Sequence, residues 1–89
     1  MSYTLHIDKN AAKTIKGLDR TTINRIYKRP KELAKDPMDL RISDPVEMSQ
    51  EAERKSRVGN WRIFYEIDDD NHTININAVR PRGRAYRKF

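Results

Sequence analysis

Residues 61–79 restrict the fold of this 89-residue chain more than any other segment, because apolar and polar side chains alternate there with the period of a β-strand. We expect WRIFYEI and TININAV to form two strands joined by the polar turn DDDNH. The preceding Gly59-Asn60 pair is a strong hairpin signal, so AERKSRV is expected to pair as a third strand. The expected core face carries Trp61, Ile63, Tyr65, Ile67, Ile74, Ile76 and Ala78. The expected opposite face of the middle strand carries Arg62, Phe64 and Glu66.

The first half of the chain has helical spacing. YTLHI reads as a short strand, and Asp8 is suited to cap a helix whose apolar residues are Ala11, Ile15 and Leu18. A second apolar stripe runs from Ile23 to Ala34. Pro30 interrupts this stripe, and we expect a kink or break there, since a proline inside a helix costs about 3 kcal/mol. DPMDLRISDPVEMSQ, with its two Asp-Pro pairs, is expected to be an irregular connection.

This order of elements, β-α-α-β-β-β, predicts an α+β fold formed by one domain over residues 1–89. An N-terminal strand precedes a two-helix hairpin that packs on one face of an antiparallel sheet, and a C-terminal β-meander completes that sheet. The other face of the sheet is then open to solvent or to a ligand.

Composition excludes several kinds of site. The chain has no cysteine, so disulfides and thiolate metal centres are excluded, and the acidic run Asp68–Asp70 is a poor metal site without further spaced ligands. The start of the chain lacks the apolar run of a signal peptide, and no stretch is long and apolar enough to span a membrane. We therefore expect a cytoplasmic protein without a metal or other cofactor.

Charge is segregated along the chain. The net charge is +6, the acids gather near Asp68–Asp70 and mid-chain, and the last residues, VRPRGRAYRKF, are purely basic. A basic surface of this kind is typical of proteins that bind nucleic acid, although solubility alone would also explain it. If the meander pairs as expected, the cations share the open sheet face near Tyr86, a pattern suited to single-stranded RNA. The candidate RNA- or ribosome-binding residues are Arg54, Arg57, Arg80, Arg84, Arg87 and Lys88.

Plainer interpretations stay open for these residues. Arg62 on an exposed strand face is equally consistent with a solvated charge, and Lys55 and Arg57 have acids nearby with which to form surface ion pairs. Tyr86 is also compatible with packing at the edge of the sheet, and Arg87 with a frayed terminus.

Two motifs resemble the RelE/ParE toxin superfamily, and specifically its RelE-type mRNA endonucleases. RVGNWRIFYEID is similar to the family segment R-x-G-x-(Y/W)-R-(I/V)-x-Y, and VRPRGRAYR is similar to the C-terminal V-x-x-R-x-x-x-Y-R, in a form found in archaeal members. The resemblance implies a type II toxin that cuts mRNA in the A site of the 30S ribosomal subunit without a metal. It also implies inhibition by an acidic RelB-type antitoxin.

The same resemblance assigns catalytic positions to Arg62, Arg82, Tyr86 and Lys55, while Glu53 stands where well-studied members carry a second lysine. Arginine does not deprotonate near neutral pH, so Arg62 and Arg82 are best read as electrostatic clamps on the phosphate. Tyr86 is a candidate base or stacking platform, and Lys55 is a candidate for either proton transfer. Two alternatives are a ParE-like, non-catalytic inhibitor of DNA gyrase and a basic RNA-binding module without activity.

Overall fold

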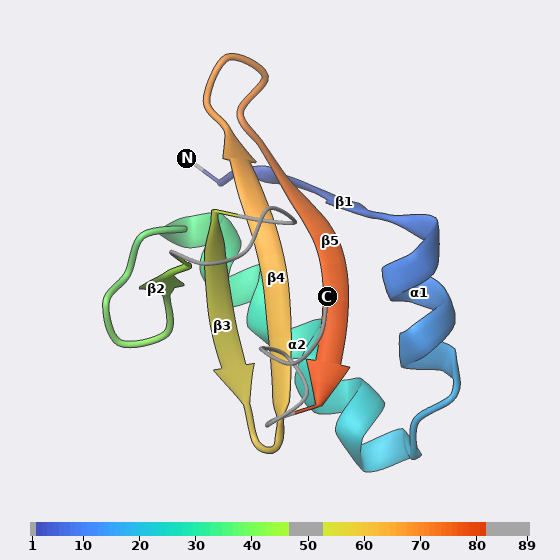
Figure 1. The fold of residues 1–89 in the computed structure, drawn as a ribbon. Coiled ribbons are helices and arrows are strands. Elements are labelled where there is room, and N and C mark those ends of the chain that lie inside the picture. The colour runs from blue at the N-terminus through green and yellow to red at the C-terminus, as the bar shows by residue number, and fades with distance from the viewer. Residues whose placement is uncertain (1, 47–52, 82–89) are drawn as a thin grey trace.

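The computed structural model describes residues 2–46 and 53–81, which form a twisted five-stranded sheet with two helices on one side (Figure 1). The strand order is β1-β5-β4-β3-β2, so the longest strands, β4 and β5, lie at the centre. The predicted α+β architecture is confirmed. The elements are β1 Thr4–Ile7, α1 Lys9–Lys16, α2 Arg20–Lys35, β2 Asp44–Pro45, β3 Arg54–Val58, β4 Trp61–Asp68 and β5 Thr73–Pro81.

Aspartates stand at the start of both helices. Asp8 has the extended backbone of an N-cap residue, without a side-chain capping bond, and Asp19 caps α2 by accepting a hydrogen bond from the Thr22 amide at 3.1 Å. The Thr22 hydroxyl donates to the same carboxyl group at 2.7 Å. Capping of this kind satisfies amide groups that have no partner within the first turn of a helix.

The predicted break at Pro30 is wrong. Helix α2 continues through this residue to Lys35, and Pro30 itself is buried. Ile26 and Leu33, on the same face of the helix, retain 1% and 0% of their surface. Burying two such side chains contributes about 3–6 kcal/mol in total, which offsets the roughly 3 kcal/mol that an internal proline costs.

The sheet is mostly antiparallel, but its first strand is not. The predicted meander forms, and Val58 pairs with Trp61 across a turn in which Gly59 has a φ of 59°. This left-handed backbone is the reason for a glycine at the turn. Strand β1 instead pairs with β5 in parallel, from Thr4 opposite Thr73 to Ile7 opposite Ile76. The first and last strands of the described chain are thus neighbours in the sheet, and β1 occupies the edge beside β5.

A β-bulge in β5 changes which side chains face the helices. Phe64 pairs with Ala78 but the next residue, Tyr65, pairs with Ile76, so β5 has one extra residue between the two pairs. Val79 therefore joins the core, whereas Ala78 packs with Phe64 and Val46 in a small separate cluster. The prediction that Ala78 faces the helices is wrong, because a bulge shifts the alternation by one residue.

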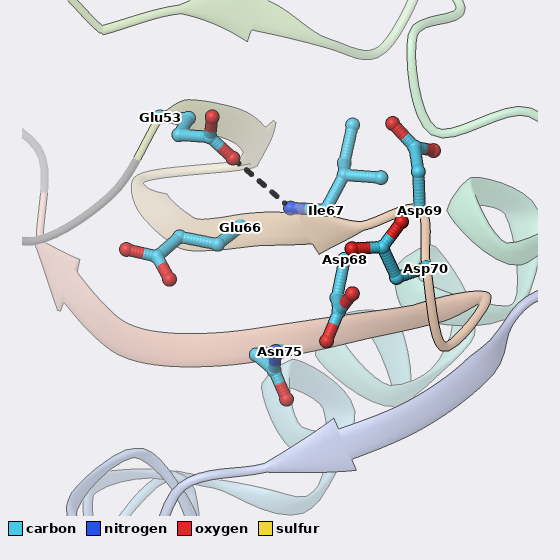
Figure 2. Close-up of a pocket in the computed structure, with 7 residues that line it drawn as sticks. All are labelled: Glu53, Glu66, Ile67, Asp68, Asp69, Asp70 and Asn75. Atoms are coloured by element: carbon cyan, nitrogen blue, oxygen red, sulfur yellow. Dashed lines mark hydrogen bonds between the residues drawn. The ribbon is translucent and has the colours of Figure 1, made fainter.

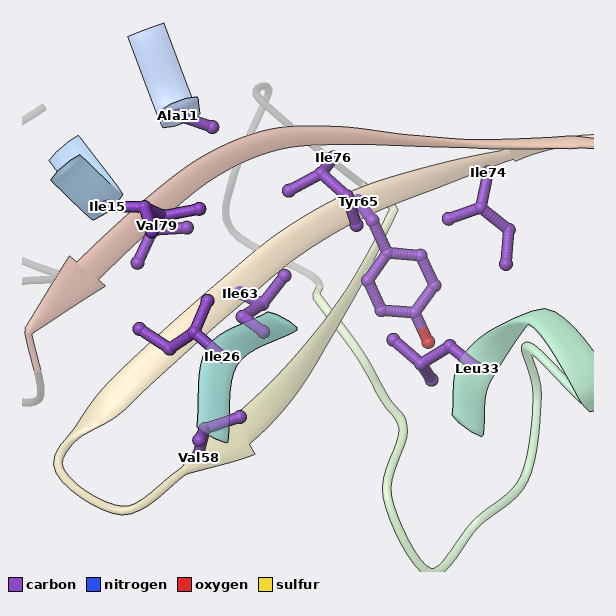
Figure 3. Packing of buried hydrophobic residues seen from close by; sticks show 10 residues of the cluster. All are labelled: Ala11, Ile15, Ile26, Leu33, Val58, Ile63, Tyr65, Ile74, Ile76 and Val79. Carbon is purple, nitrogen blue, oxygen red and sulfur yellow. The ribbon is translucent and has the colours of Figure 1, made fainter. Parts of the chain in front are cut away.

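The main core lies between the helices and the sheet, and its buried side chains interdigitate (Figure 3). As predicted, Ile63 and Tyr65 point into it, and Trp61 and Ile67 pack at its margin. The cluster consists of Ala11, Ile15, Ile26, Leu33, Val58, Ile63, Tyr65, Ile74, Ile76 and Val79.

The connection after α2 is more ordered than its two Asp-Pro pairs suggest. Asp44 and Pro45 form β2 and pair with Lys55 and Arg54 at the edge of the sheet, so the prediction of a wholly irregular segment is wrong here. The chain after Val46 up to residue 52 lies outside the described part of the chain.

A buried chain of hydrogen bonds holds this connection to the core. Arg54 Nε donates to Ser43 Oγ at 2.6 Å, and Tyr65 Oη donates to the Pro37 carbonyl oxygen at 2.8 Å. The Ser43 and Tyr65 hydroxyls are also hydrogen-bonded to each other. Since the tyrosine proton is used on Pro37, Ser43 is the donor in that pair. Burial raises the pKa of Tyr65, which keeps this hydroxyl protonated.

Candidate functional site: the open face of the sheet

We call the side of β3, β4 and β5 turned away from the helices the open face, although its central residues Arg62, Phe64 and Ala78 are themselves buried. Three arginines lie there at directly paired positions, since Arg57 of β3 is opposite Arg62 of β4, and Arg62 is opposite Arg80 of β5. We call these three residues the arginine row. Like charges directly opposite one another repel across a sheet, and a row of three guanidinium groups attracts an anion.

The bulge in β5 is what brings Arg80 into the row. Counted by strict alternation from Ile74 and Ile76, Arg80 would face the helices. The extra residue between the Tyr65–Ile76 and Phe64–Ala78 pairs reverses this, so Arg80 shares the face of Arg62. Bulges of this kind redirect side chains next to functional sites.

The three arginines differ in their exposure. The Arg57 side chain is 64% exposed, with its Nε 3.9 Å from a carboxylate oxygen of Asp44. Arg80 is half-buried, and Arg62 retains only 7% of its surface. Arg62 Nη1 donates a 3.3 Å hydrogen bond to the Trp61 carbonyl oxygen. Arg62 therefore faces away from the helices, as predicted, but is not the solvated surface charge that an exposed strand position would suggest.

Lys55 lies beside the row, opposite Phe64 on β4. Its pKa is lowered, first by partial burial and then by the charge of Arg57, with a smaller contribution from Arg62, while Asp44 acts in the opposite direction. A lysine with a lowered pKa exchanges a proton more readily near neutral pH than a solvated one. Of the candidate catalytic residues, Lys55 and Arg62 are thus both on the open face.

Arg54 is placed differently from the prediction. It pairs with Tyr65 and shares the helix-covered side of the sheet, where its guanidinium group contacts Ser43. The expectation that Arg54 lies on the open face with the other cations is wrong, because adjacent strand residues point to opposite sides. The candidates Arg82, Arg84, Tyr86, Arg87 and Lys88 lie outside the described residues.

Sequence reasoning missed Arg29, which fastens α2 to β3. Its Nη1 donates to the Arg57 carbonyl oxygen at 2.6 Å and to Ser56 Oγ at 2.9 Å, and its Nε pairs with Glu32 at 3.0 Å. Arg29 thus holds the backbone that carries Arg57. No local signal distinguishes it from the other cations of α2, since the contact depends on how the helix docks.

The far end of the open face is acidic. Glu66 and Asp68 of β4 share the face of Arg62 by alternation, and they line a pocket of about 690 Å³ with Glu53 and the acids of the β4–β5 turn (Figure 2). Glu53 accepts a 3.2 Å hydrogen bond from the Ile67 amide. The pocket is lined by Glu53, Glu66, Ile67, Asp68, Asp69, Asp70 and Asn75.

The described residues hold no group of three or more His, Cys, Asp or Glu side chains arranged to bind a metal ion. Of the two histidines, His72 stacks on Tyr3 with ring centroids 3.9 Å apart. Within residues 2–46 and 53–81, neither helix is long and apolar enough to cross a membrane.

Comparison with solved structures finds the same fold in known proteins. The archaeal RelE–RelB complex from Pyrococcus horikoshii OT3 contains a chain that superposes with a TM-score of 0.80 at 23% identity, covering 94% of this chain and 99% of that one. The RelBE2 toxin–antitoxin complex from Mycobacterium tuberculosis gives a TM-score of 0.79 at 24% identity, covering 92% and 100%.

Sequence comparison points to the same group. Toxin RelE of Mycobacterium tuberculosis is 32% identical over 47 residues, which is 53% of this chain and about half, 48%, of that protein. The family model described as "ParE toxin of type II toxin-antitoxin system, parDE" matches residues 5–86, nearly the entire chain. The chain therefore belongs to this family of type II toxins, within the RelE/ParE superfamily.

Proposed function

We propose that this toxin is an endoribonuclease that cleaves mRNA in the ribosomal A site and thereby inhibits translation. The observation that carries the proposal is the arginine row with Lys55 beside it, because it gathers cations and a lysine of lowered pKa on one sheet face. Arginine binds phosphate through a planar, bidentate fork, and a lysine of lowered pKa is suited to proton transfer.

The proposed reaction is attack of a ribose 2′-oxygen on the adjacent phosphorus. The new P–O2′ bond forms as the P–O5′ bond breaks, which leaves a 2′,3′-cyclic phosphate and a free 5′-hydroxyl. A base takes the 2′-hydroxyl proton, an acid supplies a proton to the 5′-oxygen, and cations stabilise the extra negative charge between these steps. Arg62, Arg80 and the sequence-assigned Arg82 are the proposed cations.

Lys55 is the proposed acid for the leaving 5′-oxygen. Its lowered pKa makes its proton easier to donate, and its position beside Arg57 and Arg62 supports a role next to a phosphate held by the arginine row. The sequence motif assigns Tyr86 as the base or as a platform for stacking a base. Because Arg62 is 7% exposed, its contact with a phosphate requires rearrangement on binding, as catalytic contacts often do. The ribosome supplies the substrate orientation that so small a site lacks.

The proposed partner in inhibition is a RelB-type antitoxin. Two of the similar structures are complexes of RelE-type toxins with their antitoxins, which supports a partner of this kind. An antitoxin that covers the arginine row would exclude mRNA from it, and its binding should weaken as salt rises. Action on ribosomes would place the toxin in the cytoplasm.

The test is to add purified protein to translating ribosomes and to map mRNA 5′ ends by primer extension. We expect new ends within the A-site codon for the wild type and for Lys28→Ala, an exposed helix position, and far fewer for Arg80→Ala. Absence of new ends for every protein would overturn the nuclease proposal.

The description of the matching family as ParE favours a second candidate, a binding inhibitor of DNA gyrase with the same fold. A supercoiling assay on the same preparation separates the two. Inhibited gyrase with intact mRNA would establish the second candidate, whereas cut mRNA with active gyrase would exclude it.

A further inference from the structure

Charge reverses along the strands of the open face. At the end near the β3–β4 turn lies the arginine row, and at the other end Glu66 and Asp68 face the same side of β4. Between them Phe64 and Ala78 pack together with Val46 as a small apolar cluster. A polyanion on this face therefore meets attraction at one end of the strands and repulsion at the other.

The two ends are far enough apart to act separately. Arg62 and Glu66 are four positions apart on β4, which corresponds to about 14 Å along an antiparallel strand. The Debye length at physiological ionic strength is about 8 Å, so the charge of one end is largely screened at the other. The open face thus has a basic end and an acidic end that act separately on a bound polyanion.

The acids of the far end take no part in the ion pairs of the described residues. The three ion pairs among residues 2–46 and 53–81 involve Glu32, Asp39 and Asp44, and none involves an acid of the pocket in Figure 2. Hydrogen bonds from the Asn71 side chain and backbone lower the pKa of Asp68, which holds it as a carboxylate.

We propose that Glu66, backed by the acids of this pocket, is a specificity-determining residue that confines single-stranded RNA to the arginine row. This inference rests on the proposed function and adds the path of the substrate. The RNA crosses β3, β4 and β5 at their basic end, because a backbone running along the strands would bring phosphates over Glu66 and Asp68. Glu66 is the decisive residue since it is the acid of β4 closest to the row on that face.

The number of phosphates that the face can hold follows from this path. Adjacent strands are about 4.8 Å apart, so the row spans roughly 10 Å from Arg57 to Arg80. Only a short oligonucleotide fits over it. A longer strand must leave the face or approach the acids, and in either case it gains no further contact with the arginine row.

The experiment measures binding of uridine oligomers of increasing length by fluorescence anisotropy at low salt. For the wild type, affinity should rise with length and then stop rising at a short oligomer. Glu66→Lys should move this plateau to a longer oligomer and make the salt dependence steeper, by about 0.7 in log–log slope for each added phosphate contact. Glu66→Gln should relieve the repulsion without adding a contact, so longer oligomers bind more tightly while the salt slope stays that of the wild type.

Asp36→Lys is the matched control. It makes the same charge change at an exposed position after α2, away from the open face, so it should leave the plateau length unchanged. Melting curves check that each variant is folded. If Glu66→Lys and Asp36→Lys give the same plateau, or if the wild type binds no uridine oligomer, the proposed path is wrong.

This outcome is independent of the cleavage test. A longer plateau for Glu66→Lys with no mRNA cleavage by the wild type would keep the RNA path and reject the nuclease. Cleavage by the wild type, with the same plateau length for Glu66→Lys as for the wild type, would keep the nuclease and reject the RNA path.

Discussion

The two faces of β4 differ in their surroundings, although their residues alternate along one strand. Ile63 and Tyr65 are fully buried among the side chains of both helices, whereas Arg62 and Glu66 face away from the helices, among charged groups. Apolar burial is the main favourable contribution to folding, while fixed charges on a surface contribute little to stability and much to binding. Stability and function should therefore be separable by substitutions at Ile63 and Glu66, three positions apart on β4.

The largest expected effect comes from the helix-covered face. Ile63→Ala removes a side chain with 0% exposure from the centre of the core, and the cavity left behind should lower the free energy of unfolding by about 2–5 kcal/mol. Glu66→Gln, on the other face, should change it by less than about 0.5 kcal/mol. Urea denaturation of both variants measures the difference. Similar losses of unfolding free energy for the two variants would mean that the two faces contribute equally to stability, contrary to this account.

The next effect concerns catalysis by residues that the motif assigns to the open face. Arg82→Ala and Tyr86→Phe should bind ribosomes nearly as the wild type does but cleave about a hundred to a thousand times more slowly, or about 2.7–4 kcal/mol in barrier. Arg87→Ala should instead weaken binding and flatten its salt dependence, with little change in the saturated rate. Single-turnover cleavage at saturating ribosomes distinguishes them. Equal losses of ribosome affinity in all three variants, with unchanged saturated cleavage rates, would mean that these residues only bind a polyanion and do not take part in catalysis.

A third effect tests the hydrogen-bonded chain behind the core. Tyr65→Phe keeps the ring but leaves the buried Ser43 hydroxyl and the Pro37 carbonyl without this partner, so it should destabilise the fold by about 1–3 kcal/mol. The same substitution at Tyr3, whose hydroxyl donates to Asp69 at the surface, should have a smaller effect. Thermal melting compares the two, and cleavage at low temperature should be unchanged in both. A larger loss at Tyr3 would contradict this account.

These contrasts also show what the sequence could predict. The period-2 pattern of residues 61–67 assigned the two faces of β4 correctly, because side chains of a strand alternate whatever its partners are. The pattern of residues 73–79 failed at Ala78, since INA alternates smoothly and contains no sign of the extra residue. A bulge is determined by how β5 pairs with β4 and not by β5 alone.

The pairing partner and direction of β1, and the continuity of α2, could not be predicted from the sequence either. Nothing in YTLHI indicates that β1 pairs in parallel with β5, and the helix through Pro30 depends on burial of Ile26 and Leu33. The arginine row could be predicted only in outline. Arg57, Arg62 and Arg80 lie side by side because of the β3–β4 register, the β4–β5 register and the bulge in β5. Arg54, adjacent to Lys55, points to the other side of the sheet.

The smallest expected effect is a pair of opposite pH shifts on the open face, and it tests whether Lys55 is the acid. If protonated Lys55 donates to the leaving oxygen, the cleavage rate falls as pH rises through the pKa of Lys55. Arg57 lowers this pKa and Asp44 raises it. Arg57→Gln should therefore move the fall in rate to higher pH, and Asp44→Asn should move it to lower pH, measured under single-turnover conditions with saturating ribosomes. Both substitutions also remove the contact between Arg57 and Asp44. If only the loss of this contact mattered, the two variants would shift the pH profile in the same direction. Opposite shifts of the pH profile are expected only if the titrating group interacts with the charges of both residues, as Lys55 does. Shifts in the same direction would mean that another group transfers the proton.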